Sequence, residues 1–346
     1  MGQLYEPQDA DQVMFYKEQK DGQILEEGIN EAGSFSSWIA SGTSYSTTGI
    51  QTIPFYIFYS MFGFQRIGDL AWAAGDSRTR GFLLGATAGR TTLNGEGLQH
   101  EDGHSHLLSA TIPNCVSYDP CFAYELAVIV QNGLYRMIEN QEDVYYYITI
   151  MNENYSHPDM PKGVEDHIIK GMYQFSKAPG KAKNKVQLMG SGVILREVIE
   201  AAQLLENDWG VESDIWSVTS FTELRRNALD VERHNLLNPD DEQRSFIQEQ
   251  ITDTESPIIA STDYMKSFSD QIANFIPNSF TSLGTDGFGR SDSREALRSF
   301  FEVDRYYVVL AALKALKDQG KIDKKVMSEA IKKYNINPSK VNPALS

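Results

Sequence analysis

The segment Val186–Val218, which reads VQLMGSGVILREVIEAAQLLENDWGVESDIWSV, carries the pattern that decides the fold class. Val186–Gly192 is a short apolar run that ends in a glycine turn, which is typical of a buried strand, and Ile194–Trp209 has the apolar spacing of a helix. Asp214–Val218 has the composition of a second strand. A strand, a helix and a strand of these lengths predict one βαβ unit with parallel strands.

The rest of the chain repeats this alternation of strand and helix. The strands that we expect elsewhere are 53–58, 82–85, 114–118, 144–150, 257–262 and 282–285, and the expected helices are 34–46, 62–74, 124–138, 306–317 and 325–334. Such an order predicts an α/β protein whose sheets are mostly parallel and flanked by helices. We expect a solvated basic hairpin at Lys177–Lys185 and polar surface at 238–256.

Length and proline placement predict two domains. The chain has 346 residues with 41% hydrophobic residues, and at about 150 residues per domain this length suggests two. Pro158, Pro161 and Gly163 mark a linker. We therefore expect an exposed or mobile arm at 1–23, a first domain at 24–160 and a second at 161–346.

Charge and composition exclude some classes of partner. The net charge of −16 disfavours nucleic acid and anionic membranes, which are themselves negative. The longest apolar run, Ile53–Phe64, is too short to span a bilayer. Cys115 and Cys121 are too few for a secreted disulfide scaffold, so we expect them to be buried in a reducing, cytoplasmic setting.

Three of the six histidines fall within seven residues of a glycine-rich loop, Gly95–His106. Glu96, His100, His104 and His106 have donor atoms suited to a metal ion, but Gly97 and Gly103 interrupt the helix that would align them. The same side chains suit an active-site loop that moves protons and binds an anionic substrate. A histidine-rich surface loop is the third interpretation. Outside this loop, Gly192 follows a predicted strand and precedes a predicted helix. The glycine turn there either holds an anion through its backbone amides or serves packing alone.

A second candidate is the acidic cluster Glu26–Glu31. Acids in this arrangement are commonly a solvated helix start, because carboxylates are favoured at helix N-termini. Glu31, however, leads directly into AGSFSSWI, which is small and apolar. A carboxylate at the edge of a buried face is poorly solvated, which favours its protonated form and suits it to acid–base chemistry.

Several long motifs together resemble one known family. They are EGINEAG (27–33), IPFYIFYSMFGFQRIGD (53–69), GRTTLNGEGLQHEDGHSH (89–106), SFTEL (220–224), ASTDYMK (260–266), GTDGFGRSDSRE (284–295) and VNPAL (341–345). These motifs resemble the homodimeric bacterial pyruvate dehydrogenase, the thiamine-diphosphate-dependent decarboxylating component of the pyruvate dehydrogenase complex. The resemblance covers essentially the whole chain, but it corresponds only to the C-terminal part of the family. It implies a truncated pyrimidine-binding domain followed by a transketolase C-terminal-like domain.

The resemblance also implies roles for particular residues. Glu31 matches the glutamate that exchanges a proton with the aminopyrimidine ring of the cofactor, and Ile29 matches the bulky residue that supports the bent cofactor. Tyr59 and Phe62 match aromatic residues of the aminopyrimidine pocket. His100 matches a histidine that binds pyruvate, with Glu96 in the same loop. His104 and His106 are assigned more weakly to that substrate site.

The resemblance further implies a cofactor and binding partners for this chain. Thiamine diphosphate is the implied cofactor, with Mg²⁺ held by an N-terminal domain whose Gly-Asp-Gly…Asn motif we do not find here. The implied partners are a second chain or the N-terminal portion of the same enzyme, pyruvate, and the lipoyl domain of dihydrolipoyl acetyltransferase. An inactive assembly fragment and a transketolase-like enzyme are the alternatives.

Overall fold

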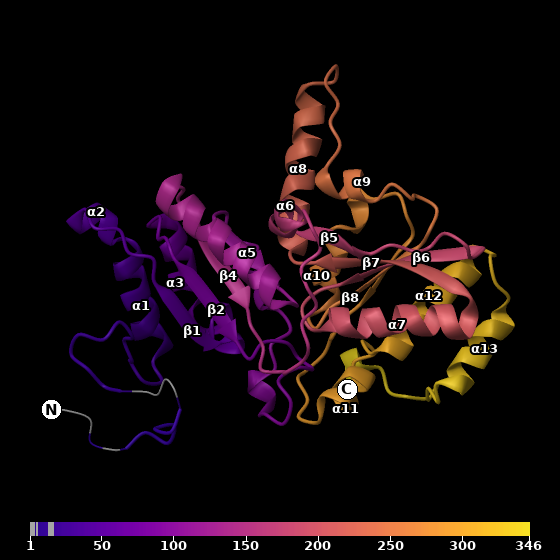
Figure 1. Ribbon diagram of the computed structural model, residues 1–346, viewed down its shortest axis with the longest axis horizontal. Coiled ribbons are helices and arrows are strands. Elements are labelled where there is room, and N and C mark those ends of the chain that lie inside the picture. The colour runs from indigo at the N-terminus through magenta and orange to yellow at the C-terminus, as the bar shows by residue number, and fades with distance from the viewer. Residues whose placement is uncertain (1–3, 5, 13–16) are drawn as a thin grey trace.

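The structure is a computed structural model that describes residues 4, 6–12 and 17–346. Its two sheets form two lobes side by side, one on each side of the predicted linker (Figure 1). Residues 1–3, 5 and 13–16 of the predicted arm lie outside the described residues. The described residues from 17 to 30 form no helix or strand and are mostly exposed.

The first sheet has four parallel strands in the order β1-β2-β4-β3. They are β1 Phe55–Tyr59, β2 Phe82–Ala86, β3 Cys115–Tyr118 and β4 Tyr145–Thr149. The associated helices are α1 Glu31–Gly42, α2 Ser44–Thr48, α3 Phe64–Asp76, α4 Ser105–Ser109, α5 Ala123–Leu134 and α6 Glu165–Lys170, with short turns η1 Ser60–Phe62, η2 Leu98–His100 and η3 Tyr135–Glu139. β4 is buried on both faces, which explains its uninterrupted run of tyrosines and Ile148.

The second sheet has five strands in the order β5-β7-β6-β8-β9. They are β5 Met172–Ser176, β6 Asn184–Gly190, β7 Val211–Val218, β8 Ile258–Ser261 and β9 Phe280–Leu283. The helices are α7 Ile194–Trp209, α8 Phe221–Leu237, α9 Phe246–Gln250, α10 Lys266–Asp270, α11 Arg294–Phe300, α12 Arg305–Asp318 and α13 Lys324–Lys333, with turns η4 Ala273–Phe275 and η5 Pro343–Leu345. β6, α7 and β7 form the predicted βαβ unit, with parallel strands that pair Leu188 with Ile215.

The helix α7 shows why this unit folds as it does. Its buried residues Ile194, Val198, Ala201 and Leu205 recur every three or four positions and so form one apolar stripe. This stripe packs in the same core as the inner strands and the buried face of α12. The α/β class with sheets flanked by helices is therefore confirmed.

In this sheet β6, β7, β8 and β9 are parallel, as expected of a mostly parallel sheet, whereas β5 pairs antiparallel with β7. Two expectations for the second domain were wrong in detail. The basic segment 177–185 is no hairpin, since β7 lies between β5 and β6; instead, the carboxylate of Glu212 accepts backbone N–H groups of Gly180, Lys181 and Ala182. Segment 238–256 is not all surface, because α9 buries Phe246 and Ile247.

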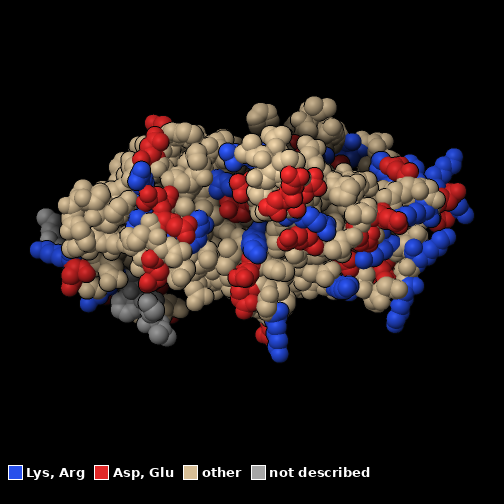
Figure 2. All heavy atoms as spheres, turned by 90° about the horizontal axis from the view of Figure 1, so that it is seen from above, with Lys and Arg blue, Asp and Glu red and all other residues tan. Residues whose placement is uncertain are grey.

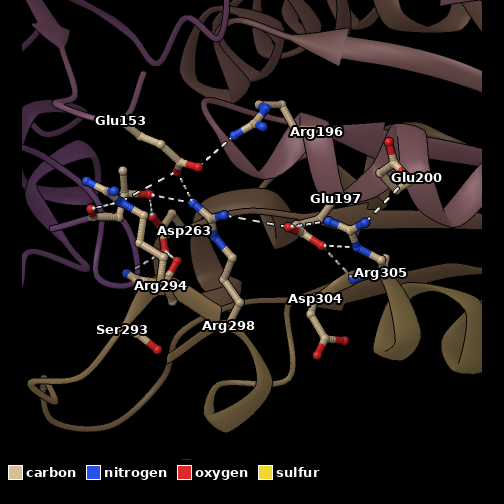
Figure 3. Close-up of polar contacts among 12 residues, drawn as sticks. Glu153, Arg196, Glu197, Glu200, Asp263, Ser293, Arg294, Arg298, Asp304 and Arg305 are labelled. Carbon is tan, nitrogen blue, oxygen red and sulfur yellow. Dashed lines mark hydrogen bonds and ion pairs between the residues drawn. The ribbon is translucent and has the colours of Figure 1, made fainter. Parts of the chain in front are cut away.

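The two domains are joined by a cluster of ion pairs, shown in Figure 3. Glu153, in the linker, contacts Arg196 of α7 and Arg298 of α11. Arg298 also lies 3.6 Å from Glu197, which pairs with Arg305. Burial alone would raise the pKa of Glu153, but hydrogen bonds and charge from Arg298 and Arg196 outweigh it and hold this pKa below the usual value. The linker is thus held by charge pairs that water screens poorly.

Charged side chains of both signs are spread over the surface. In Figure 2, acidic and basic side chains are intermixed over the visible described residues, with more lysine and arginine at the end that carries α13. None of the helices among the described residues combines the length and the apolar composition needed to cross a membrane. Both cysteines are free and buried, as expected.

Candidate active site

Glu31 lies at the first position of α1. Asn30 caps this helix by accepting a hydrogen bond from the Gly33 N–H at 3.1 Å, so the chain turns sharply just before Glu31. The Glu31 side chain is 16% exposed, and its carboxylate lies 2.9 Å from the guanidinium of Arg66 on α3. The acid is therefore held in place between two helices at the edge of a buried face.

Aromatic rings connect this ion pair to the histidine loop. The Arg66 guanidinium lies over the ring of Phe62, 4.1 Å from its centroid. Phe62 and Tyr59 both contact His100, with ring centroids 5.0 and 5.2 Å from the imidazole. Because η1 follows β1 directly, the end of one strand presents both rings to the turn η2 that carries His100.

His100 has an unsatisfied ring nitrogen. Its Nδ1 is buried and has no hydrogen-bond partner among the described residues, although a carboxylate oxygen of Glu96 lies 3.8 Å away. A buried nitrogen of this kind normally finds a partner. Together, the ion pair, the ring contacts and the position of Glu96 bring together five of the residues predicted from the sequence: Glu31, Tyr59, Phe62, Glu96 and His100.

A cavity of about 1120 Å³ lies beside this cluster, between β1 and the segment 23–30. Glu31, Tyr59 and Phe62 line it, and so does Ile29, which is 98% exposed. Tyr56 of β1 also lines this cavity. Burial raises the pKa of its hydroxyl, and the charges of Glu31 and Glu27 raise it further despite a hydrogen bond with Ser34.

His104 and His106 lie apart from the ring cluster. His106 is fully buried; its ring nitrogens lie 2.6 Å from the Ser117 hydroxyl and 3.0 Å from the Thr149 hydroxyl, and its ring stacks on Phe268 of the second domain. Burial lowers the pKa of His106 to about 3, so it is neutral. This position is that of a core residue between the domains. His104 faces a second cavity, and burial lowers its pKa as well.

The histidine loop does not form a metal cage among the residues that the structure describes. No group of three or more histidine, cysteine or acidic side chains is placed to hold an ion in that part of the chain. The four candidate donors point to different places, since His106 is in the core and His104 lines a separate cavity. Gly97 and Gly103 lie outside η2 and α4, so no continuous helix aligns the four donors, as expected.

The glycine turn after β6 serves packing. The Gly192 N–H donates to the carbonyl of Asp119 at 3.0 Å, and a Cβ at Gly192 would lie 2.5 Å from the Asp119 carboxylate. Asp119 is fully buried, and burial raises its pKa to about 7 against hydrogen bonds from Thr149 and Ser191. The Asp119 carboxyl group thus occupies the place at Gly192 where the sequence suggested that an anion could bind.

Sequence reasoning missed two residues of this region. Nothing in the sequence around Arg66 pointed to a role, apart from its position in the motif 53–69. Its contact with Glu31 joins two helices that are distant in the chain, so no local pattern predicts it. Glu101 was passed over between two histidines, yet it is 1% exposed and neither carboxylate oxygen has a hydrogen-bond partner among the described residues. A glutamate in a run of glycine and histidine was the only available signal.

Two family models match consecutive parts of this chain. The family described as pyruvate dehydrogenase E1 component middle domain matches residues 1–158, and the transketolase-like C-terminal domain matches residues 171–304. Pyruvate dehydrogenase E1 components of Cupriavidus necator and Escherichia coli K12 are 64% and 60% identical over 99% and 100% of this chain.

This chain belongs to the pyruvate dehydrogenase E1 family. It corresponds to the C-terminal part of the E1 component and spans only 38–39% of the length of these relatives. Among solved structures, a transketolase from Campylobacter jejuni has a TM-score of 0.61 at 17% identity, over 80% of this chain and 38% of that one. A protein titled a split gene transketolase, inactive beta4 tetramer, has a TM-score of 0.57 at 16% identity, over 84% and 83% of the two chains. At these identities the likeness shows the fold, and the E1 assignment rests on the sequence relatives.

Proposed function

We propose that this chain is the part of a pyruvate dehydrogenase that activates the aminopyrimidine ring of thiamine diphosphate. The complete enzyme would decarboxylate pyruvate and reductively acetylate the lipoyl group of dihydrolipoyl acetyltransferase. The observation that carries the proposal is the continuous contact from Glu31 through Arg66 and Phe62 to His100. Each of these residues lies in a motif that resembles the family.

The residues present fit one end of this cofactor. The cavity beside Glu31 has aromatic walls suited to a heteroaromatic ring. When bound, thiamine diphosphate supplies an electron sink for cleavage of the carbon–carbon bond of a 2-oxo acid. Glu31 would hold and release a proton at a ring nitrogen, and Arg66 orients its carboxylate. Tyr59, Phe62 and Ile29 would fix the ring in place.

His100 and Glu96 are proposed for the substrate side of the site. The Nδ1 of His100, which has no hydrogen-bond partner among the described residues, would donate to a bound 2-oxo acid, because the Glu96 carboxylate 3.8 Å away favours the tautomer with the proton on Nδ1. His104 is retained as a weaker candidate for a substrate contact, because it is partly buried in a neighbouring cavity. His106 is fully enclosed, so its proposed contribution is to position the loop that carries His100.

We propose that the diphosphate and Mg²⁺ are held by a portion of the enzyme that this chain does not match. The relatives are more than twice as long, and the described residues offer no cluster of acids for the ion. A second chain, or the N-terminal portion of the same enzyme, would then complete each site and give a dimer. We also propose a cytoplasmic enzyme within a multienzyme complex.

Complementation tests this function. The purified chain is mixed with thiamine diphosphate, Mg²⁺ and pyruvate, with and without the remaining N-terminal portion of an E1 component, and reduction of an artificial electron acceptor is followed. We expect no turnover from the chain alone and measurable turnover from the mixture. A mixture that assembles into a stable complex without turning over would indicate an assembly module instead. Turnover with a ketose phosphate rather than pyruvate would indicate a transketolase-like enzyme.

A further inference from the structure

The position of His100 depends on the backbone of the turn η2. The Glu101 N–H donates to the Leu98 carbonyl at 3.3 Å and closes this turn. Tyr59 and Phe62 of the first domain contact the imidazole, with ring centroids 5.2 and 5.0 Å away. The imidazole is therefore placed both by the rings that it contacts and by the backbone from which it extends.

Gly289 of the second domain packs against this backbone. A Cβ at Gly289 would lie 2.7 Å from the Leu98 carbonyl oxygen and 2.4 Å from the Glu101 Cβ. Non-bonded carbon atoms normally approach only to about 3.5–4.0 Å, so only a residue without a side chain permits this packing. The Leu98 oxygen is the acceptor that closes the turn. A shift of Gly289 toward the turn therefore displaces the backbone that carries His100.

Arg90 ties the same turn to the second domain. Arg90 is 4% exposed, and its guanidinium donates to the Glu101 carbonyl at 3.3 Å. The same group donates to the carbonyls of Thr285 and Gly287 in the second domain, at 2.5 and 2.6 Å. Hydrogen bonds from a charged donor are about twice as strong as neutral ones, and the planar guanidinium fixes their directions. The end of η2 is thus held at a set distance from the segment 285–289.

A third contact holds the far end of the same loop. The Met265 N–H of the second domain donates to the Gly103 carbonyl at 2.8 Å. The segment 98–103 is therefore connected to the second domain at three backbone positions, Leu98, Glu101 and Gly103. All five clustered residues of the candidate site lie in the first domain, yet the loop that carries one of them follows the second.

We infer that the second domain sets the position of His100, with Gly289 and Arg90 as positioning residues. Neither residue lines the cavity beside Glu31, and both act through the backbone of η2. The inference rests on the proposed function, because it matters for substrate only if His100 binds the 2-oxo acid. It then gives the second domain a role in substrate binding, since a misplacement of about 1 Å at a reacting site can cost about 10²-fold in rate.

The histidine ring signals test this position without turnover. The chain is labelled with ¹⁵N in its histidine rings, and the loss of signals in His100→Gln assigns those of His100. Gly289→Ala places a methyl group against the Leu98 oxygen, so we expect it to shift the His100 signals while those of His234, on α8, stay in place. The control is Leu205→Ala, which opens a cavity in the core beside α7 and destabilises the second domain without touching η2. It should leave the His100 signals unmoved.

Substitution of Arg90 supplies a second, graded test. Arg90→Lys keeps a charged donor but lacks the planar fork, so it should shift the His100 signals less than Arg90→Met does. In the complemented enzyme, Gly289→Ala should lower kcat/KM for pyruvate at least fivefold, whereas Leu205→Ala should leave it unchanged below its melting temperature. Unmoved His100 signals in folded Gly289→Ala and Arg90→Lys, or an equal shift in Leu205→Ala, would overturn the inference. The ring signals decide the inference alone, and the turnover of the complemented wild type decides the proposed function separately.

Discussion

The carboxylate of Glu31 and the guanidinium of Arg66 lie 2.9 Å apart, although 35 residues separate them in the chain. The contact joins the first turn of α1 to the first turn of α3, and Arg66 extends it to the ring of Phe62. It therefore couples the proposed acid to the aromatic wall of its own cavity. The contact gives Arg66 a positioning role that its motif alone did not reveal.

Replacing Arg66 should affect function more than stability. Arg66 is half exposed, and exposed ion pairs contribute about 0–1 kcal/mol. We expect Arg66→Gln to change the free energy of unfolding by less than about 1 kcal/mol, but to lower the complemented rate roughly tenfold or more, because Glu31 and Phe62 lose their shared contact. Urea unfolding and acceptor reduction measure the two quantities. Asp69→Asn, on the exposed side of the same helix, is the matched control; an unchanged rate in Arg66→Gln would remove Arg66 from the site.

Neutral, buried His106 should make the chain sensitive to acid. An ordinary histidine has a pKa near 6.5, so below this pH the unfolded chain binds a proton that the folded chain, with the His106 pKa near 3, does not. Stability is thus lost as the pH falls below 6.5, by at most about 1.4 kcal/mol per pH unit from this group. The loss between pH 7 and 5 should be smaller in His106→Asn than in wild type when measured by urea unfolding. Equal losses in the two proteins would show that His106 is protonated without unfolding.

Glu101 should make the folded chain less stable as the pH rises, which is the opposite of the pH dependence expected from His106. Its pKa in the folded chain is raised to about 8 by burial, so between its ordinary value of 4.5 and 8 the folded chain binds the extra proton. Stability should therefore fall as the pH rises through this window, by at most about 1.4 kcal/mol per pH unit. Glu101→Gln removes the titration and should flatten the decline between pH 6 and 8 in thermal melts. A decline of the same size in the variant would place the titrating group elsewhere.

The ion-pair cluster at the linker should be essential for holding the domains together. Arg298 is 6% exposed and contacts both Glu153 and Glu197. Removing one partner of a buried pair costs about 3–5 kcal/mol when the other charge is left uncompensated. Because Glu153 and Glu197 keep Arg196 and Arg305, we expect Arg298→Met to destabilise by less, about 1–3 kcal/mol, and to speed proteolysis in the linker at 152–162. Lys314→Met, in the exposed pair with Asp318, is the control and should change stability by less than about 1 kcal/mol.

Local patterns predicted most of the fold. The βαβ unit was predictable because its apolar residues repeat with the period of each element. The antiparallel β5 was not, since its place in the sheet depends on pairing with β7, which lies beyond a helix and another strand. The helix α8 was also missed: its mean composition is polar, and only Phe221, Thr222, Leu224 and Ala228 are buried.

The candidate site was predictable where one segment holds several of its groups. Glu96 and His100 are four residues apart in one loop, and Tyr59 and Phe62 are three apart at the end of one strand, so motif matching located them. The separate position of His106 was not predictable, because it depends on Phe268 and Tyr264 arriving from the second domain. Arg66 and Glu101 depend in the same way on contacts between distant segments.

The most direct test of the central claim is the complemented rate of Glu31→Gln. The amide keeps the size of the side chain but cannot exchange the proton, and removal of a general acid or base costs typically 10²–10⁴-fold. We predict a loss in this range in acceptor reduction, with thermal stability within a few degrees of wild type and with Asp69→Asn fully active. A Glu31→Gln chain that restores the wild-type rate would contradict the account.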